Sequence, residues 1–334
     1  MVEIVAVHCN PFSGAGELES QSGASPARSG SRSMKFTVQI PLGDITPGEF
    51  QTAAAVKEMA VAMESANMDA CFLTDHPAPS AAWLHANGHD ALDPFTAFAF
   101  VAAATTKLMF HTNILVLPYR NPFLTAKAAA TLQVLSGGRL ILGAGGGYQK
   151  GEFEALGVDF TKRGALFDEA LEVMRMAWAG GPVVKQGRNF NAAGNEPRPA
   201  PETPPLIWIG GGSGKAVERA ARWGDGWCPF FAAPTMSQSN QDSGIQSVEQ
   251  LGEKIKELHE MRAAQDKTGH FDIAIGPRKK PDYKTRDSAD QYIEALNELA
   301  AVGVTWAMVE PAHPSRQGFI ENVQWFGEEV IARL

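Results

Sequence analysis

Between residues 34 and 334, short apolar runs alternate with longer helical runs eight times. The apolar runs are continuous, as expected for strands that are covered on both faces. The eight predicted strands cover residues 35–41, 69–75, 107–118, 138–145, 205–212, 225–230, 271–277 and 304–311. Eight strand–helix units in this order predict an α/β fold, the (β/α)8 or TIM barrel.

The competing interpretation is a doubly wound open sheet. Such a sheet usually carries its phosphate loop after the first strand, where this chain has PLGDITPGEF, so the barrel is favoured. Two segments are too long for minimal barrel loops: residues 148–163, after strand four, and residues 181–204, before strand five. The second contains a candidate hairpin around VVKQGRNFN. Loops of that length in a compact domain are usually functional.

The first 33 residues precede this pattern. Residues 12–33 are rich in Ser, Gly and Ala, and such a segment cannot bury enough apolar surface to offset the entropy of ordering it. Met34 opens the first predicted strand. The sequence therefore predicts a flexible extension over residues 1–33 and a single barrel domain over residues 34–334.

Composition and charge exclude several classes of protein. Apolar residues make up 44% of the 334 residues and charged residues 20%, which is ordinary for a globular chain. The net charge of −8 argues against nucleic acid and anionic membranes as partners, and no apolar run approaches the roughly 18 residues of a membrane helix. Cys9, Cys71 and Cys228 form no CxxC or Cys/His cluster. We therefore expect neither a metal site nor disulfides, and a reduced, cytoplasmic protein.

Two glycine-rich segments follow predicted strands. The first, after strand five, consists of Gly210, Gly211, Gly212, Ser213 and Gly214. It opens a helix, whose N-terminus offers free N–H groups to an anion, so it is a candidate phosphate cradle for a nucleotide-like cofactor; the alternative is an ordinary capped turn. The second, after strand four, consists of Gly145, Gly146 and Gly147. Two such openings on one barrel face indicate a cofactor that spreads across the barrel mouth.

Strand two ends in Asp75 and His76. An imidazole at a strand end can hydrogen-bond a cofactor ring or move a proton; the alternative is a structural loop histidine. Neighbours on a strand point to opposite faces, so the two side chains need not touch. His85 and His89 lie four residues apart but have no third ligand nearby. Their loop, residues 77–93, is therefore expected to contact the substrate or cover the site.

Three segments carry a resemblance to a known family. They are FLTDH (72–76), NILVLPYRNPFLTAKAAATLQVLSGGRLILGAGGGY (113–148) and IWIGGGSGKAVERAARWGDGW, which ends at residue 227. In these segments the chain resembles the bacterial luciferase-like monooxygenase superfamily, and within it the coenzyme F420-dependent oxidoreductases, whose cofactor is a deazaflavin. The similarity runs in order over most of residues 35–330 and implies a (β/α)8 barrel with extra segments.

The resemblance also implies roles for individual residues. Asp75 and His76 match a pair in which the histidine lies by the deazaflavin ring. Asn113 and Ile114 match a non-proline cis peptide that forms a bulge behind the ring. The ring face would be lined by Leu115 and Val116, the cofactor approached by Gly145, Gly146 and Gly147, and its phosphate bound by the backbone of Gly210, Gly211, Gly212, Ser213 and Gly214.

Two positions depart from patterns seen in that superfamily. Some deazaflavin dehydrogenases carry a glutamate, proposed as a proton donor, just after the strand-four glycines, and here the residue is Tyr148. This puts a sugar-phosphate substrate in doubt. Many members that use flavin mononucleotide (FMN) carry an arginine for the phosphate in the same turn, where this chain has Gly146. Loss of that charge-assisted partner favours F420 over FMN.

The leading hypothesis is an F420-dependent oxidoreductase. It would transfer a hydride between the cofactor and a small organic substrate held under residues 77–93 and 181–204, with His76, Asp75 and Tyr148 as candidate catalytic residues. The alternative is an FMN-dependent monooxygenase that uses reduced flavin and oxygen. A third hypothesis is a cofactor-binding protein without turnover. The resemblance also allows a homodimer, and a separate flavin or F420 reductase that supplies reduced cofactor.

Overall fold

The structure is a computed structural model, and it describes residues 34–334 apart from 42–47, 87, 234–241, 279–284 and 312–314. The predicted extension, residues 1–33, lies outside the described residues. In the described part of the chain, no helix is both long enough and apolar enough to cross a bilayer.

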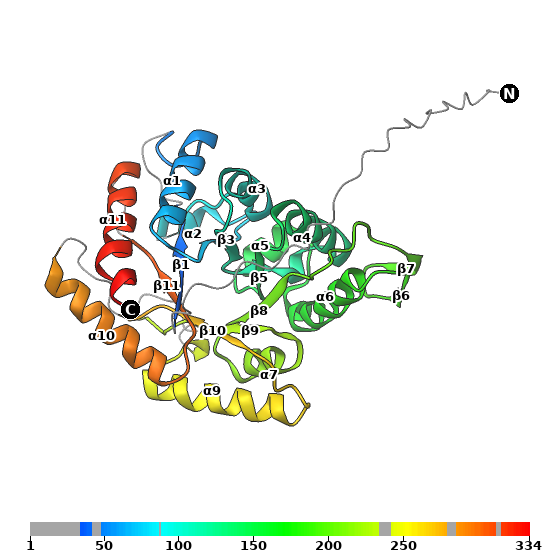
Figure 1. Ribbon diagram of the computed structural model, residues 1–334. Helices are drawn as coiled ribbons and strands as arrows, with labels where there is room; N and C mark the ends of the chain where they lie inside the picture. Colours follow the sequence, from blue (N-terminus) through cyan, green and yellow to red (C-terminus); the bar gives the residue numbers. More distant parts are fainter. Residues whose placement is uncertain (1–33, 42–47, 87, 234–241, 279–284, 312–314) are drawn as a thin grey trace, which may run out of the picture. The chain divides into compact units, whose positions relative to one another are not determined.

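Eight parallel strands form a closed barrel (Figure 1). They are β1 (Lys35–Gln39), β2 (Ala70–Leu73), β3 (Met109–Thr112), β5 (Leu140–Gly145), β8 (Leu206–Gly210), β9 (Gly226–Cys228), β10 (Asp272–Ile275) and β11 (Trp306–Val309). β1 pairs with both β2 and β11, and β3 pairs with β5, which closes the ring. This closure confirms the predicted TIM barrel over the open sheet.

The helices surround this barrel, and most of them begin where the sequence supplies a cap. They are α1 (Ala53–Ser65), α3 (Pro94–Ala104), α4 (Pro122–Ser136), α6 (Arg163–Trp178), α7 (Gly214–Trp223), α9 (Val248–Ala263), α10 (Arg286–Ala301) and α11 (Arg316–Glu329), the last followed by a 3-10 turn, η3 (Ile331–Arg333). All except α6 start after a Ser, Thr, Asp or Asn whose side chain accepts a backbone N–H of the first turn. Ser, Thr, Asp and Asn are the residues preferred at this position, because their side-chain oxygens satisfy free N–H groups of the first turn.

The barrel interior is filled by side chains from several strands. Trp208 packs edge-on against both His111 and Trp306, with ring centroids 4.6 and 5.1 Å apart. His111 is fully buried, and neither of its ring nitrogens has a hydrogen-bond partner among the described residues. Burial alone lowers the pKa of His111 to about 3, because a charged imidazolium is poorly solvated there.

Several elements differ from the sequence prediction. The third predicted strand, 107–118, is divided into β3 and β4 (Leu115–Val116), followed by the 3-10 turn η1 (Leu117–Tyr119). Residues 148–163 contain a short helix, α5 (Lys150–Ala155), and a 3-10 turn, η2 (Phe160–Lys162). The loop expected over 77–93 contains another short helix, α2 (Ala81–Ala86). These short helices have little room for a periodic apolar pattern, which is the signal that sequence reading needs.

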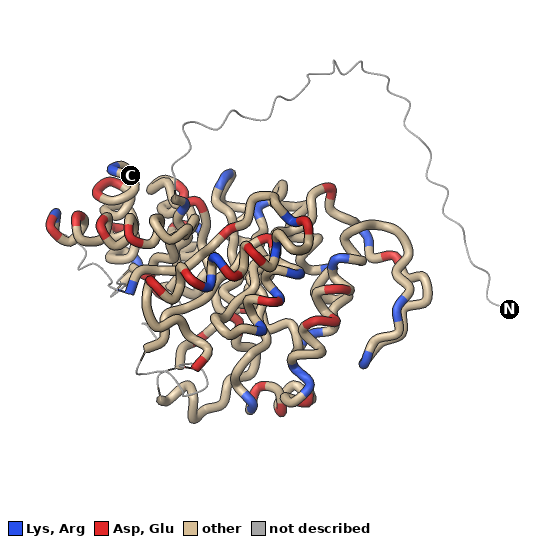
Figure 2. The backbone as a smooth tube through the Cα atoms, turned by 90° about the horizontal axis from the view of Figure 1, so that it is seen from below, with Lys and Arg blue, Asp and Glu red and all other residues tan. Residues whose placement is uncertain are grey.

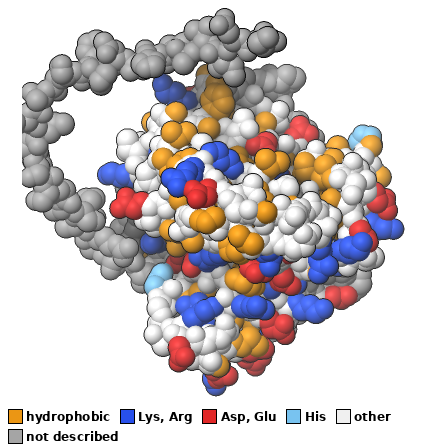
Figure 3. All heavy atoms as spheres, turned by 90° about the vertical axis from the view of Figure 1, so that its right-hand side faces the viewer, with side chains coloured by type: hydrophobic (Ala, Val, Ile, Leu, Met, Phe, Trp, Pro, Cys, Tyr) orange, Lys and Arg blue, Asp and Glu red, His pale blue; other side chains and the backbone are white. Residues whose placement is uncertain are grey.

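The hairpin that was predicted within residues 181–204 is present. It pairs β6 (Val183–Gln186) with β7 (Asn191–Asn195) in antiparallel register. Figure 3 views the domain from the side that carries this hairpin, where apolar side chains are scattered among charged ones. In Figure 2, acidic and basic residues are interspersed along the outer elements. The predicted homodimer stays a prediction.

Candidate active site

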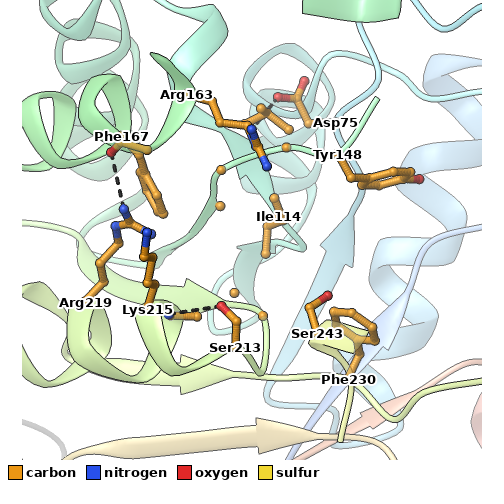
Figure 4. A pocket seen from close by; sticks show the side chains of 18 of the residues that line it. Asp75, Ile114, Tyr148, Arg163, Phe167, Ser213, Lys215, Arg219, Phe230 and Ser243 are labelled. Carbon is orange, nitrogen blue, oxygen red and sulfur yellow. Dashed lines mark hydrogen bonds between the residues drawn. The ribbon is translucent and has the colours of Figure 1, made fainter. Parts of the chain in front are cut away.

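A cavity of about 700 Å³ lies at the carboxyl ends of β2, β4, β5 and β8 (Figure 4). The predicted site residues that line it are Asp75, His76, Asn113, Ile114, Val116, Gly145, Gly146, Gly147, Tyr148, Gly210, Gly211 and Ser213. Those that sequence reasoning did not single out include Thr74, Phe160, Thr161, Arg163, Phe167, Lys215, Arg219, Phe230 and Ser243. Most of the predicted residues are therefore brought together in one place, at the face where barrel enzymes carry their sites.

Three predicted residues do not line this cavity. Leu115 is fully buried in the main hydrophobic core, because neighbouring residues on a strand point to opposite faces and Val116 takes the cavity side. The N–H of Gly212 donates to the carbonyl of Ser243 at 2.9 Å, so Gly212 packs against that segment. Gly214 is the first residue of α7 and is exposed. Leu115 was predicted to line the face of the cofactor ring, but its side chain packs in the hydrophobic core instead.

The floor of the cavity is built around Ile114. The Asn113–Ile114 peptide bond is cis, as the resemblance implied. A Cβ added to Gly145 would lie 2.3 Å from Ile114 Cδ1, and one added to Gly210 would lie 2.7 Å from Ile114 Cγ2. Only glycine at these two positions leaves room for the isoleucine side chain, which Figure 4 shows at the centre of the cavity.

Gly146 and Gly147 differ in whether their positions could accept a larger residue. Gly147 has φ of +73°, and an added Cβ would lie 2.6 Å from Val116 Cγ1. At Gly146 an added Cβ would meet only Phe167 Cδ1, at 3.9 Å. Position 147 therefore requires glycine, both for its positive φ and for the lack of space, whereas position 146 has space for a side chain.

One end of the cavity carries the start of α7 and two cationic side chains, and a third cation lines the cavity from α6. Ser213 caps α7, its hydroxyl accepting the N–H of Ala216 at 3.3 Å. Lys215 and Arg219 reach the cavity from α7. Arg219 is paired with Asp168 on α6, Nε to Oδ1 at 2.6 Å. A helix N-terminus beside positive charge suits a phosphate group.

The third cation is Arg163, at the start of α6. Its guanidinium lies 3.9 Å from the centroid of the Phe160 ring, and its Nη1 donates to the carbonyl of Phe160 at 3.0 Å. Figure 4 shows this side chain above Ile114. Sequence reasoning missed all three cations, although Lys215 directly follows the first glycine segment, which ends at Gly214. They weaken the argument from Gly146, because positive charge for a phosphate is available from other elements.

Asp75 is engaged by neighbouring elements. It is 3% exposed; Oδ1 accepts Arg120 Nη2 at 2.7 Å, and Oδ2 accepts the N–H of Val116 at 3.0 Å. Burial raises the pKa of Asp75, while the Arg120 charge and the two hydrogen bonds oppose that shift. Both oxygens therefore contact β4 and the residue after η1, and the catalytic role of Asp75 stays a prediction.

His76 contacts a carboxylate that sequence reasoning missed. Its Nδ1 lies 3.3 Å from Oε2 of Glu152 on α5 and 3.0 Å from Nε2 of Gln149. The Glu152 side chain is 1% exposed, and its Oε2 also accepts the Tyr119 hydroxyl at 2.8 Å. Sequence reasoning compared only Tyr148 with the family's proton-donor glutamate and did not consider the residues after it. A helix beginning at that point would have indicated Glu152, which lies about one helical turn further on.

Aromatic side chains surround the His76 ring. Centroid distances are 4.5 Å to Trp83, 5.3 Å to His89 and 6.3 Å to Tyr148. His89 is fixed by Thr74, Nε2 to Oγ1 at 2.9 Å; burial and then the neighbouring His76 lower the pKa of His89. Burial raises the pKa of Tyr148, which keeps its hydroxyl protonated. Within the described residues, no group of three or more His, Cys, Asp or Glu could hold a metal ion.

Residues 34–243 match the family model for luciferase-like monooxygenases. A protein of Mycobacterium tuberculosis, described as uncharacterized, is 30% identical over 257 residues, which cover 74% of this chain and 80% of that protein. The F420-dependent glucose-6-phosphate dehydrogenase of Kineococcus radiotolerans is 31% identical over 192 residues, 56% of each chain, so the match spans little more than half of that enzyme.

Among solved structures, the oxygenating constituent of the 3,6-diketocamphane monooxygenase of Pseudomonas putida, in complex with FMN, superposes with a TM-score of 0.70 at 16% identity. It covers 91% of this chain and 99% of that one. At that identity the likeness shows the shared fold. The family model covers more than half of the sequence, and its residues include the strand ends that form the cavity. The chain therefore belongs to the luciferase-like monooxygenase family and is an oxidoreductase.

Proposed function

We propose that this protein is an F420-dependent oxidoreductase that transfers a hydride between the deazaflavin and a small organic substrate. The observation that carries this proposal is one cavity with two chemically different ends. Ile114 and the bare backbone of Gly145 and Gly210 form its floor, with His76 on one side and the Ser213 cap on another. The F420-dependent relative with 31% identity supports the same assignment.

The residues present fit a deazaflavin. A volume of about 700 Å³ lies within the usual range for cofactor sites. A flat ring needs a surface without projecting side chains, which the glycines beside Ile114 supply. An anionic tail needs donors and positive charge, which the start of α7, Lys215 and Arg163 supply. When bound, the deazaflavin would supply the acceptance or donation of a hydride.

The chain's own residues would position the reactants and handle the proton. His76 lines the cavity and holds Nδ1 toward Glu152, so we assign it the proton that accompanies the hydride. Tyr148, also at the cavity, is the second candidate. Gly145, Gly146, Gly147, Gly210, Gly211 and Ser213 would contact the cofactor. The 77–93 segment places Trp83 and His89 beside His76, and it would form one wall of the substrate site.

The alternative is an FMN-dependent monooxygenase, and one observation favours it. Arg163, Lys215 and Arg219 offer the phosphate positive charge that Gly146 does not, and the Pseudomonas putida neighbour holds FMN on the same fold. This function would require a separate reductase to deliver reduced flavin, together with oxygen. The reductase, the homodimer and the cytoplasmic location stay predictions from sequence.

The proposal is tested by turnover of purified protein with F420 and a panel of alcohols, aldehydes and ketones, with and without oxygen. We expect F420 to change redox state with a member of the panel whether or not oxygen is present. His76→Ala should lower kcat by roughly 10²–10⁴-fold while F420 still binds. Turnover that requires oxygen and reduced FMN would favour the alternative.

A further inference from the structure

The Nδ1 atom of His76 has two polar neighbours, one of which requires a proton on Nδ1 and the other its absence. Oε2 of Glu152 lies 3.3 Å away; a carboxylate only accepts, so this contact requires a proton on Nδ1. Nε2 of Gln149 lies 3.0 Å away; an amide nitrogen only donates, so this contact requires an unprotonated Nδ1. The two contacts therefore correspond to the two tautomers of a neutral imidazole.

Of these two neighbours, Glu152 is the one that is fixed. Its Oε2 accepts the Tyr119 hydroxyl at 2.8 Å and its Oε1 accepts the N–H of Ala78 at 3.3 Å. Burial, and then the hydrogen bond to Glu152, raise the pKa of Tyr119, so the phenol stays a donor. These contacts come from η1 and from the segment after β2, and they hold the carboxylate from two directions.

Gln149 can adapt to either tautomer. It occupies the N-cap position of α5, and its side chain makes no capping hydrogen bond there. A half-turn of its amide exchanges Nε2 for Oε1, which can accept a proton from Nδ1. Glu152 has no such freedom, since both of its oxygens are acceptors. The fixed neighbour therefore decides which tautomer of His76 prevails.

We propose that Glu152 is a positioning residue that keeps the proton of neutral His76 on Nδ1, so that Nε2 retains its lone pair for a hydroxyl proton of the substrate. This inference rests on the proposed function and narrows the substrate class to alcohols, or to carbonyl compounds in the reverse direction. The O–H bond of the alcohol breaks and an N–H bond forms at Nε2. A deazaflavin held in the cavity would supply the acceptor for the carbinol hydride and its two electrons, so that the alcohol would become a carbonyl compound.

The geometry also stabilises the product of that proton transfer. His76 then carries protons on both nitrogens, and its positive charge faces the Glu152 carboxylate across the 3.3 Å contact. A charge-assisted hydrogen bond of this kind is stronger than a neutral one. In the reverse direction the imidazolium returns the Nε2 proton to the oxygen of the reduced carbonyl compound, and Nδ1 keeps its proton throughout.

Nitrogen NMR of the cofactor-free protein, labelled with ¹⁵N-histidine, tests the inference. Signals of His76 are identified by their loss in His76→Gln. At alkaline pH we expect the Nδ1–H tautomer to exceed the Nε2–H tautomer by roughly tenfold, a ratio that one charge-assisted hydrogen bond supports. In Glu152→Gln the ratio should fall toward one, because an amide can donate or accept, and Glu152→Asp should restore part of it.

Glu154→Gln is the matched control. Glu154 lies on the same helix, is exposed, and pairs with Lys150 at 3.3 Å, so its loss should leave the tautomer ratio unchanged. An excess of Nε2–H in the wild-type protein overturns the inference even if Glu152→Gln fails to fold. A ratio that is the same in the wild type and a folded Glu152→Gln variant also overturns it.

F420 titration of the same samples separates this inference from the proposed function. A protein with Nδ1–H in excess that does not bind F420 refutes the deazaflavin function and leaves the tautomer assignment standing. A protein that binds F420 but has Nε2–H in excess refutes the inference alone.

Discussion

Arg120 Nη2 and Asp75 Oδ1 lie 2.7 Å apart, although the two residues are 45 positions apart in the chain. The Asp75 side chain is 2% exposed and that of Arg120 is 23% exposed. The pair joins the residues that follow β2, where His76 lies, to the residue that follows η1. Its contribution is to hold two parts of the site at a fixed separation.

Removing Asp75 should therefore cost stability. Asp75→Ala leaves Arg120 without its buried partner, and breaking a buried ion pair in this way usually costs about 3–5 kcal/mol. We expect a drop toward that range in the free energy of unfolding, measured by urea denaturation. The control is Asp168→Ala, which breaks the more exposed pair with Arg219 and should cost about 1 kcal/mol or less. Equal effects of the two substitutions would contradict the positioning role.

The two glycines before position 147 should respond differently to the same change. Gly145→Ala would place its Cβ 2.3 Å from Ile114 Cδ1, and such overpacking usually costs about 1–3 kcal/mol. We expect lower stability and cofactor binding weakened roughly tenfold or more, because Ile114 must move from the cavity floor. Gly146→Ala meets only Phe167, at 3.9 Å, and should change both quantities little. Thermal melts measure the stability of the two variants, and cofactor titrations measure their binding. Equal effects of the two substitutions would contradict this prediction.

The fold could be read from sequence because its signals are local. Eight apolar runs, each followed by a helical run, need no knowledge of distant contacts, and the second methionine, Met34, marked where the pattern begins. Strand ends such as those at Gly145 and Gly210 were also readable, since a barrel places all of them on one face.

The rest of the site depended on contacts between distant residues. Glu152 meets His76 across 76 positions, and Arg163 and Arg219 reach the cavity from two helices. No spacing rule connects such residues. Leu115 was misplaced for a local reason, because adjacent residues on a strand point to opposite faces and Val116 takes the cavity side.

His111 should make stability depend on pH. Its pKa is about 3 in the folded protein and about 6.5 when unfolded. Between these values the unfolded chain binds a proton that the folded protein does not, so this contribution is complete above about pH 6.5 and is lost as the pH falls toward 3. At pH 5 the loss is about 2 kcal/mol relative to pH 7.

Urea denaturation at pH 7 and at pH 5 measures this contribution by comparison with His111→Met. The variant has no titrating group at that position, so its loss of stability between the two pH values should be smaller than that of the wild type by about 2 kcal/mol. Other carboxylates and histidines titrate in both proteins and cancel in the comparison. Identical losses would show that His111 is not buried without a partner.

The most direct test of the central claim is a binding titration of the purified protein with F420 and with FMN, followed by absorbance and fluorescence. We predict that F420 binds and that FMN binds at least about tenfold more weakly. In this account the cations of α6 and α7 hold the anionic tail of F420, and Gly146 supplies no charge-assisted contact to an isolated phosphate. Preferential binding of FMN would contradict the account. It would mean that Arg163, Lys215 and Arg219 form a flavin phosphate site, and that the chemistry is oxygen-dependent.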